Sequence, residues 1–356
     1  STCQREEEFV ILFASVFVKK VCIYFFNTMK GDFYNMLHLK RLGLILGLGL
    51  LLAVFAACGA DDSAEEDTGS ENTEDTTEES SEGTSSEEDS NNYSEELDYK
   101  ITGIEAGAGV FKASEAAVEE YGLDGWEVQA SSSGAMATAL GEAISNEEPI
   151  IVTGWTPHWK FAKYDLKYLD DPQGVFGEAE IISTMVREGL EEDMPNAYKL
   201  LDQFNWTTED METVMLEISD GVAPEEAAAT WVEDNADKVS EWTEGVEEVD
   251  GQEIELVYVE WDSEIASTNV VGNVLEDLGF NVTITPLDNA VMWQAVANGE
   301  ADGMVAAWLP ATHGDLYEEY KDQLVDLGEN LSGAKIGLVV PTYMDIDSIE
   351  DLEPAN

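Results

Sequence analysis

Short apolar runs that end in tryptophan recur along the chain and indicate buried strands. The runs 150–153 and 303–306 lead into Gly154-Trp155 and Ala307-Trp308, and a proline follows each tryptophan two positions later. A short continuous apolar run of this kind is consistent with a strand buried on both faces. The sequence therefore predicts two strands that each present an indole ring at their end.

The elements around these two strands repeat in the same order. Each copy has a helical segment ending near a glycine, a strand, a methionine-containing helix, and then the strand that ends in Trp-x-Pro. The glycines are Gly122 and Gly279, and the methionines are Met136 and Met292. Two copies of roughly 70 residues are too few for a solenoid, which needs three or more stacked units. We therefore expect two α/β lobes that face each other.

A glycine-rich bend follows the first predicted strand, at 99–104. The bend leads into a helix near Gly109, and the start of a helix leaves backbone N–H groups that favour an anion. The third glycine of a dinucleotide fingerprint is missing, and no P-loop lysine follows. A site for a small anion and a plain tight turn both remain open at this point.

Apolar residues at helical spacing predict a helical block from 178 to 246. Ile181, Ile182, Met185 and Val186 begin the pattern, and prolines occur near the expected helix starts. We expect three tryptophans of this block to serve core packing: Trp206, Trp231 and Trp242.

A third tryptophan lies at the end of a predicted strand. The strand 254–259 is followed by Trp261, and Asp262 or Ser263 is the expected N-cap of the next helix. Ligands of open α/β sheets bind beyond the carboxyl ends of strands. Indole rings gathered there suit a cation that donates no hydrogen bonds, notably a quaternary ammonium, at about 0.5–2 kcal/mol per ring. Because micromolar affinity requires about 8 kcal/mol, a second recognition element is also needed.

The charge of the chain is strongly acidic and excludes some partners. Its 356 residues carry 76 Asp plus Glu against 16 Lys plus Arg, a formal net charge of -60. Such a surface repels nucleic acid and anionic lipid headgroups, so we expect no nucleic-acid partner. Salt would screen the self-repulsion, which makes a salty or alkaline habitat a hypothesis.

The N-terminal region predicts an exported lipoprotein. Residues 1–35 have no usable period, and we interpret them as an over-extended gene model with Met36 as the start. A basic region and an apolar run make 36–57 a signal peptide, and the junction before Cys58 resembles a lipobox with Phe55 in place of leucine. Lipidation of Cys58 is thus expected, with a signal anchor that is never cut as the alternative.

The segment 58–98 is predicted to be an acidic, disordered linker. It is rich in Asp, Glu, Ser and Thr and contains no Lys or Arg, so it cannot bury enough surface to offset its ordering entropy. The cysteines are Cys3, Cys22 and Cys58, so no disulfide lies beyond that point.

Five motifs are distributed over about residues 98–352. They are Gly-Trp-Thr-Pro-His-Trp at 154–159, Lys-Tyr-Leu-Asp-Asp-Pro at 167–172, Trp-Asp-Ser-Glu-Ile-Ala-Ser-Thr-Asn at 261–269, Ala-Trp-Leu-Pro-Ala-Thr-His at 307–313 and Gly-Leu-Val-Val-Pro-Thr-Tyr-Met at 337–344. Together they closely resemble the glycine betaine-binding lipoproteins of Gram-positive osmoprotectant ABC importers. The resemblance implies a two-lobed clamshell of the periplasmic-binding-protein type (type II), each lobe a mixed sheet flanked by helices, with the ligand between the lobes.

The resemblance also implies the site residues. The trimethylammonium group is expected in a prism of three indoles, and the ligand carboxylate on two backbone amides and a histidine. The family has Gly-Ile where this chain has Gly109-Val110, a change that a backbone contact tolerates. The residues implied are Trp155, Trp261 and Trp308 for the ammonium, and Gly109, Val110 and His313 for the carboxylate.

The resemblance further implies how the lobes are built from the chain. One lobe is expected to comprise 98–177 plus 333–356 and the other 178–332, with the strand near 333–340 crossing the hinge. The closed form would dock on ABC permease subunits at the outer face of the cell membrane. We expect a monomer without a cofactor or a metal.

Other functions remain as alternatives. A choline- or carnitine-binding protein of the same importer class is the nearest, although choline offers no carboxylate to His313 and the Gly109 bend. A quaternary-ammonium-processing enzyme is the remote alternative, because the chain lacks a Gly-x-Ser-x-Gly elbow, zinc spacing and a cysteine nucleophile after Cys58. We expect packing roles for His158, Trp126, Trp159 and Trp293.

Overall fold

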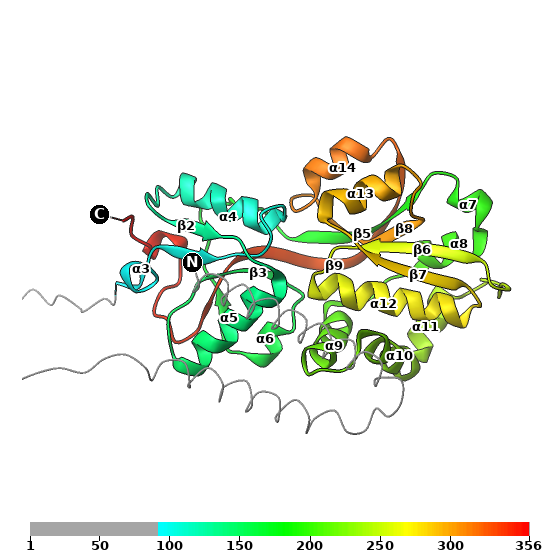
Figure 1. Cartoon of the computed structure of the whole chain (residues 1–356), viewed down its shortest axis with the longest axis horizontal. Coiled ribbons are helices and arrows are strands. Elements are labelled where there is room, and N and C mark those ends of the chain that lie inside the picture. The colour runs from blue at the N-terminus through cyan, green and yellow to red at the C-terminus, as the bar shows by residue number, and fades with distance from the viewer. Residues whose placement is uncertain (1–91, 356) are drawn as a thin grey trace, which may run out of the picture. The chain divides into compact units, whose positions relative to one another are not determined.

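The two predicted repeats form two sheets with the same strand order (Figure 1). The computed structural model describes residues 92–355. In the first sheet β1 lies between β2 and β3 and is parallel to both, and in the second β6 lies between β7 and β8 in the same way. The predicted fold class, a two-lobed clamshell of mixed sheets flanked by helices, is confirmed.

The described elements follow the chain in this order. The strands are Lys100–Thr102 (β1), Glu127–Gln129 (β2), Val152–Thr156 (β3), Leu166–Tyr168 (β4), Glu180–Arg187 (β5), Glu253–Tyr258 (β6), Asn281–Pro286 (β7), Gly303–Leu309 (β8) and Leu324–Pro341 (β9). The helices are Tyr93–Glu96 (α3), Gly109–Glu120 (α4), Ser133–Asn146 (α5), Lys160–Lys163 (α6), Leu190–Asp193 (α7), Pro195–Gln203 (α8), Thr208–Ser219 (α9), Pro224–Asp234 (α10), Ala236–Trp242 (α11), Asp262–Asp277 (α12), Asn289–Ala297 (α13), Gly314–Tyr320 (α14) and the 3-10 turn Ile349–Asp351.

The long strand β9 joins the two sheets. Its residues 324–334 pair antiparallel with β5, and its residues 335–341 pair antiparallel with β3 and β4. The strands therefore form the continuous order β2-β1-β3-β9-β5-β8-β6-β7. We call the part built on β1–β4 lobe 1 and the part built on β5–β8 lobe 2. The predicted residue boundaries, 98–177 plus 333–356 and 178–332, stay a prediction.

The prediction of a helix at the start of the block 178–246 is wrong. Residues 180–187 form β5, which lies between β8 and β9 and pairs antiparallel with both. Because an inner strand with covered faces needs no polar alternation, its apolar residues matched helical spacing by chance. From Pro195 onward the block is helical as predicted, and Pro195 and Pro224 occupy first-turn positions.

The helical block covers one face of lobe 2. Helices α9 and α10 pack on α12, and Figure 1 shows them below it. The predicted packing role of three tryptophans is confirmed, since all are buried and the rings of Trp231 and Trp242 stack at 5.7 Å. The third, Trp206, meets Trp231 edge-on.

The folded part begins earlier than predicted. Helix α3 lies within the expected linker 58–98, and two of its side chains accept backbone N–H groups from the C-terminal region. The Tyr93 hydroxyl accepts from Asp345, and the Ser94 hydroxyl accepts from Glu353. The predictions for 1–35, 36–57 and Cys58 lie outside the described residues. Among helices within 92–355, none has the length and apolar character needed to cross a membrane.

Candidate functional site

The three predicted indoles meet at one cavity. Trp155 lies in β3, Trp308 in β8, and Trp261 immediately before α12, so both lobes contribute. Each side chain is almost fully buried, and the rings of Trp155 and Trp261 lie 6.5 Å apart with an angle of 47° between their planes. The repeat thus brings corresponding strand ends to a shared centre.

The cavity between the indoles is very small. Its volume is about 10 Å³, and its other lining residues are Ile104, Val110, Thr312 and Ile336. That volume is close to the lower limit for a single water molecule. A ligand with three methyl groups therefore fits only when the rings, or the lobes that carry them, move apart.

Two carboxylates orient the indoles through their N–H groups. Trp308 donates to Glu264 at 2.6 Å within lobe 2, and Trp261 donates to Glu105 of lobe 1 at 3.1 Å. The second bond therefore crosses between the lobes. Each bond directs a carboxyl oxygen at the edge of an indole ring, and an ionised carboxylate in that position suits a cage for a cation.

Glu264 is a buried ionisable group in direct contact with the cage. It is 1% exposed, and burial raises its pKa to about 7 despite hydrogen bonds from Ser263 and Trp308. Its charge therefore changes close to neutral pH.

The glycine-rich bend starts a helix at the cavity, as predicted. Helix α4 begins at Gly109 after the N-cap residue Ala108, and no side chain among the described residues caps it. The backbone N–H groups of a first helical turn have no acceptor within the helix and favour an anion. Val110 lines the cavity. A Cβ atom on Gly109 would lie 2.5 Å from the Thr312 carbonyl oxygen, so the bend packs directly against the loop that leads to His313.

His313 lies behind Trp261 as a buried neutral ring. Its Nδ1 accepts the backbone N–H of Trp308 at 3.0 Å, so the proton of the neutral imidazole is on Nε2, a buried atom without a partner in residues 92–355. Burial lowers its pKa to about 3. The imidazole stacks on the Trp261 ring at 5.8 Å, although His313 is not among the residues that line the cavity.

Glu180 holds the loop between Trp308 and His313. This carboxylate is 1% exposed and accepts the backbone N–H groups of Ala311 and Thr312 and the Thr312 hydroxyl, at 2.5–2.9 Å. Charge-assisted bonds of this kind are stronger than neutral ones. They fix the loop that faces Gly109.

The outer side of Trp155 carries two buried basic residues. The His158 ring meets it edge-on at 4.6 Å, and the Lys160 ammonium lies 4.2 Å from its ring centroid. Lys160 is fully buried, and burial lowers its pKa to about 7. His158 is also buried, and burial lowers its pKa to about 4.

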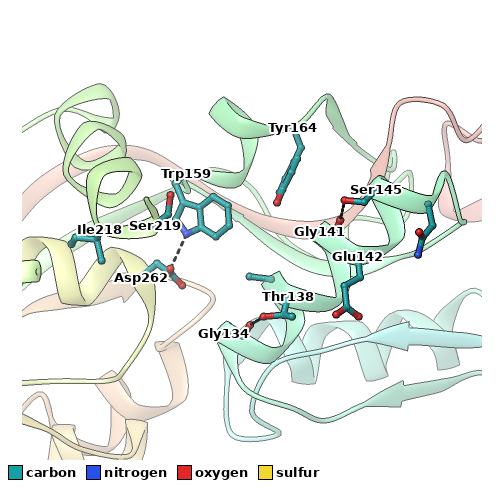
Figure 2. A pocket seen from close by; sticks show the side chains of 12 residues that line it. Gly134, Thr138, Gly141, Glu142, Ser145, Trp159, Tyr164, Ile218, Ser219 and Asp262 are labelled. Carbon is teal, nitrogen blue, oxygen red and sulfur yellow. Dashed lines mark hydrogen bonds between the residues drawn. The ribbon is translucent and has the colours of Figure 1, made fainter. Parts of the chain in front are cut away.

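A groove of about 750 Å³ opens beside the cage between α5 and the end of α9 (Figure 2). Trp159 and Asp262 line it, and the Trp159 N–H donates to the Asp262 carboxylate at 2.7 Å. Trp159 therefore forms a polar contact between the lobes in addition to its predicted packing.

The carboxylates around the cage were not among the predicted site residues. Glu105, Glu180, Asp262 and Glu264 each hold a residue of the site or of the opposite lobe. In a chain with 76 acidic residues no local pattern distinguishes them. Asp262 and Glu264 gave a weak signal, because they lie one and three positions after Trp261 in the motif 261–269. Within 92–355 no group of three or more potential metal ligands occurs.

Comparisons with known proteins find a family model and a relative that each match most of the chain. The family model described as the substrate binding domain of ABC-type glycine betaine transport systems matches residues 72–234 and 252–356. The glycine betaine/carnitine transport binding protein GbuC of Listeria monocytogenes is 51% identical over 321 residues, which cover 88% of this chain and 99% of that protein.

Two solved structures are also similar. Lactococcal OpuAC, in a closed conformation with glycine betaine, is 55% identical over 41% of this chain and 57% of that chain, with a TM-score of 0.39. A choline-binding protein of an ABC transporter, in complex with choline, is 30% identical over 52% of this chain and 61% of that chain, with a TM-score of 0.39. On the family match and the Listeria relative, the chain belongs to the substrate-binding domains of ABC-type glycine betaine transport systems.

Proposed function

We propose that this protein captures glycine betaine between its lobes and holds the trimethylammonium group among Trp155, Trp261 and Trp308. The observation that carries the proposal is the convergence of these three buried indoles from both lobes on one cavity. A trimethylammonium group donates no hydrogen bonds, so aromatic faces are its natural partners. The carboxylates behind Trp261 and Trp308 add a negative potential that favours the cation.

The ligand carboxylate would be held by the amides of Gly109 and Val110 and by His313. Within residues 92–355, no side chain caps the start of α4 at the cavity, and His313 carries its proton on an Nε2 without a partner. A neutral imidazole N–H suffices as a donor, so the low pKa of His313 does not oppose this role. Three charge-assisted bonds at roughly 1.5–3 kcal/mol each supply the affinity that the indoles lack.

The protein would deliver its ligand to the permease subunits of an ABC importer as an osmoprotectant. Substrate-binding proteins of this family act outside the cytoplasm. A lipid on Cys58 would keep the domain at the outer face of the membrane as a monomer, and mass spectrometry of wild type and Cys58→Ala tests that anchor. We propose binding without catalysis, so glycine betaine should be recovered unchanged.

Titration calorimetry with three ligands tests the proposal. Glycine betaine should bind tightly, and 3,3-dimethylbutanoate should bind far more weakly, because it has the same shape but carbon in place of the charged nitrogen. Choline, which lacks the carboxylate, should also bind more weakly. Equal binding of glycine betaine and 3,3-dimethylbutanoate, which keeps the carboxylate but lacks the cationic nitrogen, would overturn the cation cage.

Carnitine is a second candidate ligand. The relative with 51% identity is named for both glycine betaine and carnitine. Carnitine carries the same trimethylammonium group but a longer chain, and the tight packing of Gly109 on Thr312 favours the shorter ligand. Adding carnitine to the calorimetry ranks the two.

A further inference from the structure

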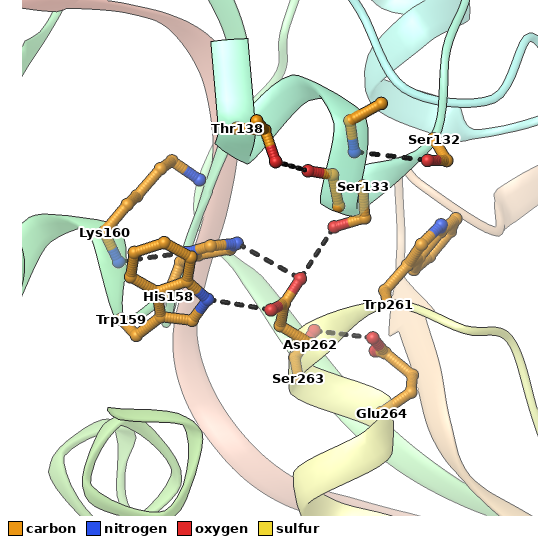
Figure 3. Close-up of polar contacts among 12 residues, drawn as sticks. Ser132, Ser133, Thr138, His158, Trp159, Lys160, Trp261, Asp262, Ser263 and Glu264 are labelled. Carbon is orange, nitrogen blue, oxygen red and sulfur yellow. Dashed lines mark hydrogen bonds and ion pairs between the residues drawn. The ribbon is translucent and has the colours of Figure 1, made fainter. Parts of the chain in front are cut away.

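Asp262 belongs to lobe 2 but forms its side-chain hydrogen bonds with lobe 1. It is the first residue of α12 and directly follows Trp261. Its carboxylate accepts the Ser133 hydroxyl and the Trp159 indole N–H, each at 2.7 Å. Figure 3 shows the carboxylate between these donors. Acidic residues at helix starts often cap their own helix, but in the part of the chain that the structure describes α12 has no side-chain cap.

The receiving side in lobe 1 suits a carboxylate. Ser133 is the first residue of α5, and the N-terminus of a helix favours negative charge. His158 Nε2 lies 3.6 Å from Asp262, and His158 Nδ1 accepts the backbone N–H of Lys160, so its proton faces the carboxylate. Burial alone would raise the pKa of Asp262, but His158, Ser133 and Trp159 outweigh it and lower the pKa. The group is therefore ionised when the lobes meet.

The residues that form the Asp262 contact are close to cage residues in the chain and in space. Trp261 is the chain neighbour of Asp262, and Trp155 meets His158 edge-on at 4.6 Å. When Asp262 binds Ser133 and Trp159, Trp261 therefore approaches Trp155. Within residues 92–355, the bond from Trp261 to Glu105 is the only hydrogen bond between a cage indole and the opposite lobe.

We propose that Asp262 is a positioning residue that latches lobe 2 onto lobe 1 while the cage holds its ligand. The latch rests on the proposed function, because the ligand whose release it slows is the betaine. When the lobes separate, the carboxylate exchanges Ser133 and Trp159 for water. Its main effect is therefore on dissociation, since the encounter of the ligand with open lobes precedes the contact.

Stopped-flow tryptophan fluorescence with glycine betaine tests the latch. Asp262→Ala should raise the dissociation rate constant roughly tenfold or more and change the association rate constant by less than about threefold. Asp262→Asn keeps the volume and one acceptor, so it should show a smaller increase. The matched control is Asp277→Asn, which removes a charge from the exposed end of the same helix and should leave both rates unchanged.

A double-mutant cycle with Ser133→Ala separates a latch from a general structural role. If the two side chains act through one contact, Ser133→Ala should add little to the dissociation rate once Asp262 is replaced. Thermal unfolding without ligand identifies any variant that fails to fold. If Asp262→Ala does not fold, the test is made with the conservative variants Asp262→Asn and Ser133→Ala.

The outcomes distinguish the latch from the proposed function. If wild type binds glycine betaine and Asp262→Ala and Asp262→Asn release it at the wild-type rate, the latch is overturned alone. Fully additive effects of the Asp262 and Ser133 replacements would overturn it as well. If wild type does not bind glycine betaine, the proposed function fails and the latch fails with it.

Discussion

Glu264 accepts the indole N–H of Trp308 at 2.6 Å while both side chains are at most 2% exposed. This bond connects the charge state of a buried carboxyl directly to a ring of the cage. Burial raises the pKa of Glu264 to about 7, so the carboxyl is protonated in acid and ionised in mild alkali. Only the ionised form places a full negative charge at the Trp308 ring and strengthens its attraction for a cation.

The affinity for glycine betaine should therefore rise as the pH rises through about 7. Calorimetry between about pH 6 and about pH 8 should show this increase in wild type and a smaller increase in Glu264→Gln. Part of the increase should persist, because Lys160 loses its charge behind Trp155 over the same range. Glu276→Gln, on the exposed side of α12, is the control. An unchanged pH profile in Glu264→Gln would contradict the role of Glu264.

Each cage indole should contribute measurably to binding. Trp155→Ala, Trp261→Ala and Trp308→Ala should each weaken glycine betaine binding by a factor of about 2–30, from about 0.5–2 kcal/mol per cation–π contact. Lost burial would add to this factor. Trp242→Phe, in the helical block, controls for the loss of a buried indole and should leave the affinity unchanged. Wild-type affinity in all three cage variants would rule the cage out.

His313 should matter more for carboxylated ligands than for choline. His313→Ala removes the unpartnered Nε2–H that we assign to the ligand carboxylate, so calorimetry should show a larger loss for glycine betaine. The expected difference is about tenfold or more, the value of a charge-assisted hydrogen bond. Equal losses for both ligands would show that the replacement acts through the stacking of His313 on Trp261 instead.

Gly109→Ala should weaken binding by obstructing closure. The new Cβ would meet the Thr312 carbonyl oxygen at 2.5 Å, and that loop is held by Glu180. Gly107→Ala is a matched control two residues earlier, where a Cβ meets nothing within 4 Å. Small-angle scattering with saturating glycine betaine should show a more open Gly109→Ala protein and an unaffected Gly107→Ala protein. If Gly109→Ala bound glycine betaine with wild-type affinity, the loop at Thr312 would have to move aside without cost, and the expected obstruction would be ruled out.

Lys160 should reduce the stability of the fold near neutral pH. Its pKa is about 7 in the folded protein and 10.5 ordinarily, so between these values the unfolded chain binds more protons and stability rises with pH. Lys160→Met should raise the free energy of unfolding at pH 7 by more than about 1.4 kcal/mol and flatten this rise. Denaturant unfolding at several pH values measures it, with the partly exposed Lys163→Met as the control. If the stability of Lys160→Met rose with pH as steeply as that of the wild type, Lys160 would not be the cause of the rise.

Local sequence signals were sufficient for the elements that carry the cage. The strands ending at Trp155 and Trp308 and the helix starting at Gly109 each depend on a few neighbouring residues, and the structure contains all of them. Strand β5 was mistaken for a helix because the side chains on both of its faces are buried, with α8 and α13 packed against it, and this removes the alternation that identifies a strand.

The polar contacts of the site depend on positions that only the tertiary fold brings together. Asp262 was expected to be a candidate cap for its own helix, but it binds Ser133, 129 positions earlier. Glu105 and Trp261 are separated by 156 positions. Local propensities describe how a side chain interacts with residues close to it in the sequence. These carboxylates instead accept hydrogen bonds from residues that are distant in the sequence, so local patterns could not predict their partners.

The single strand Leu324–Pro341 has a consequence for how the protein can be divided. A fragment that ends at residue 334 would leave β3 and β4 without their common partner, and a fragment that ends at residue 323 would also leave one edge of β5 unpaired. Exposed strand edges of this kind promote aggregation. Halves of the molecule prepared separately should therefore be insoluble alone and regain solubility only when co-expressed.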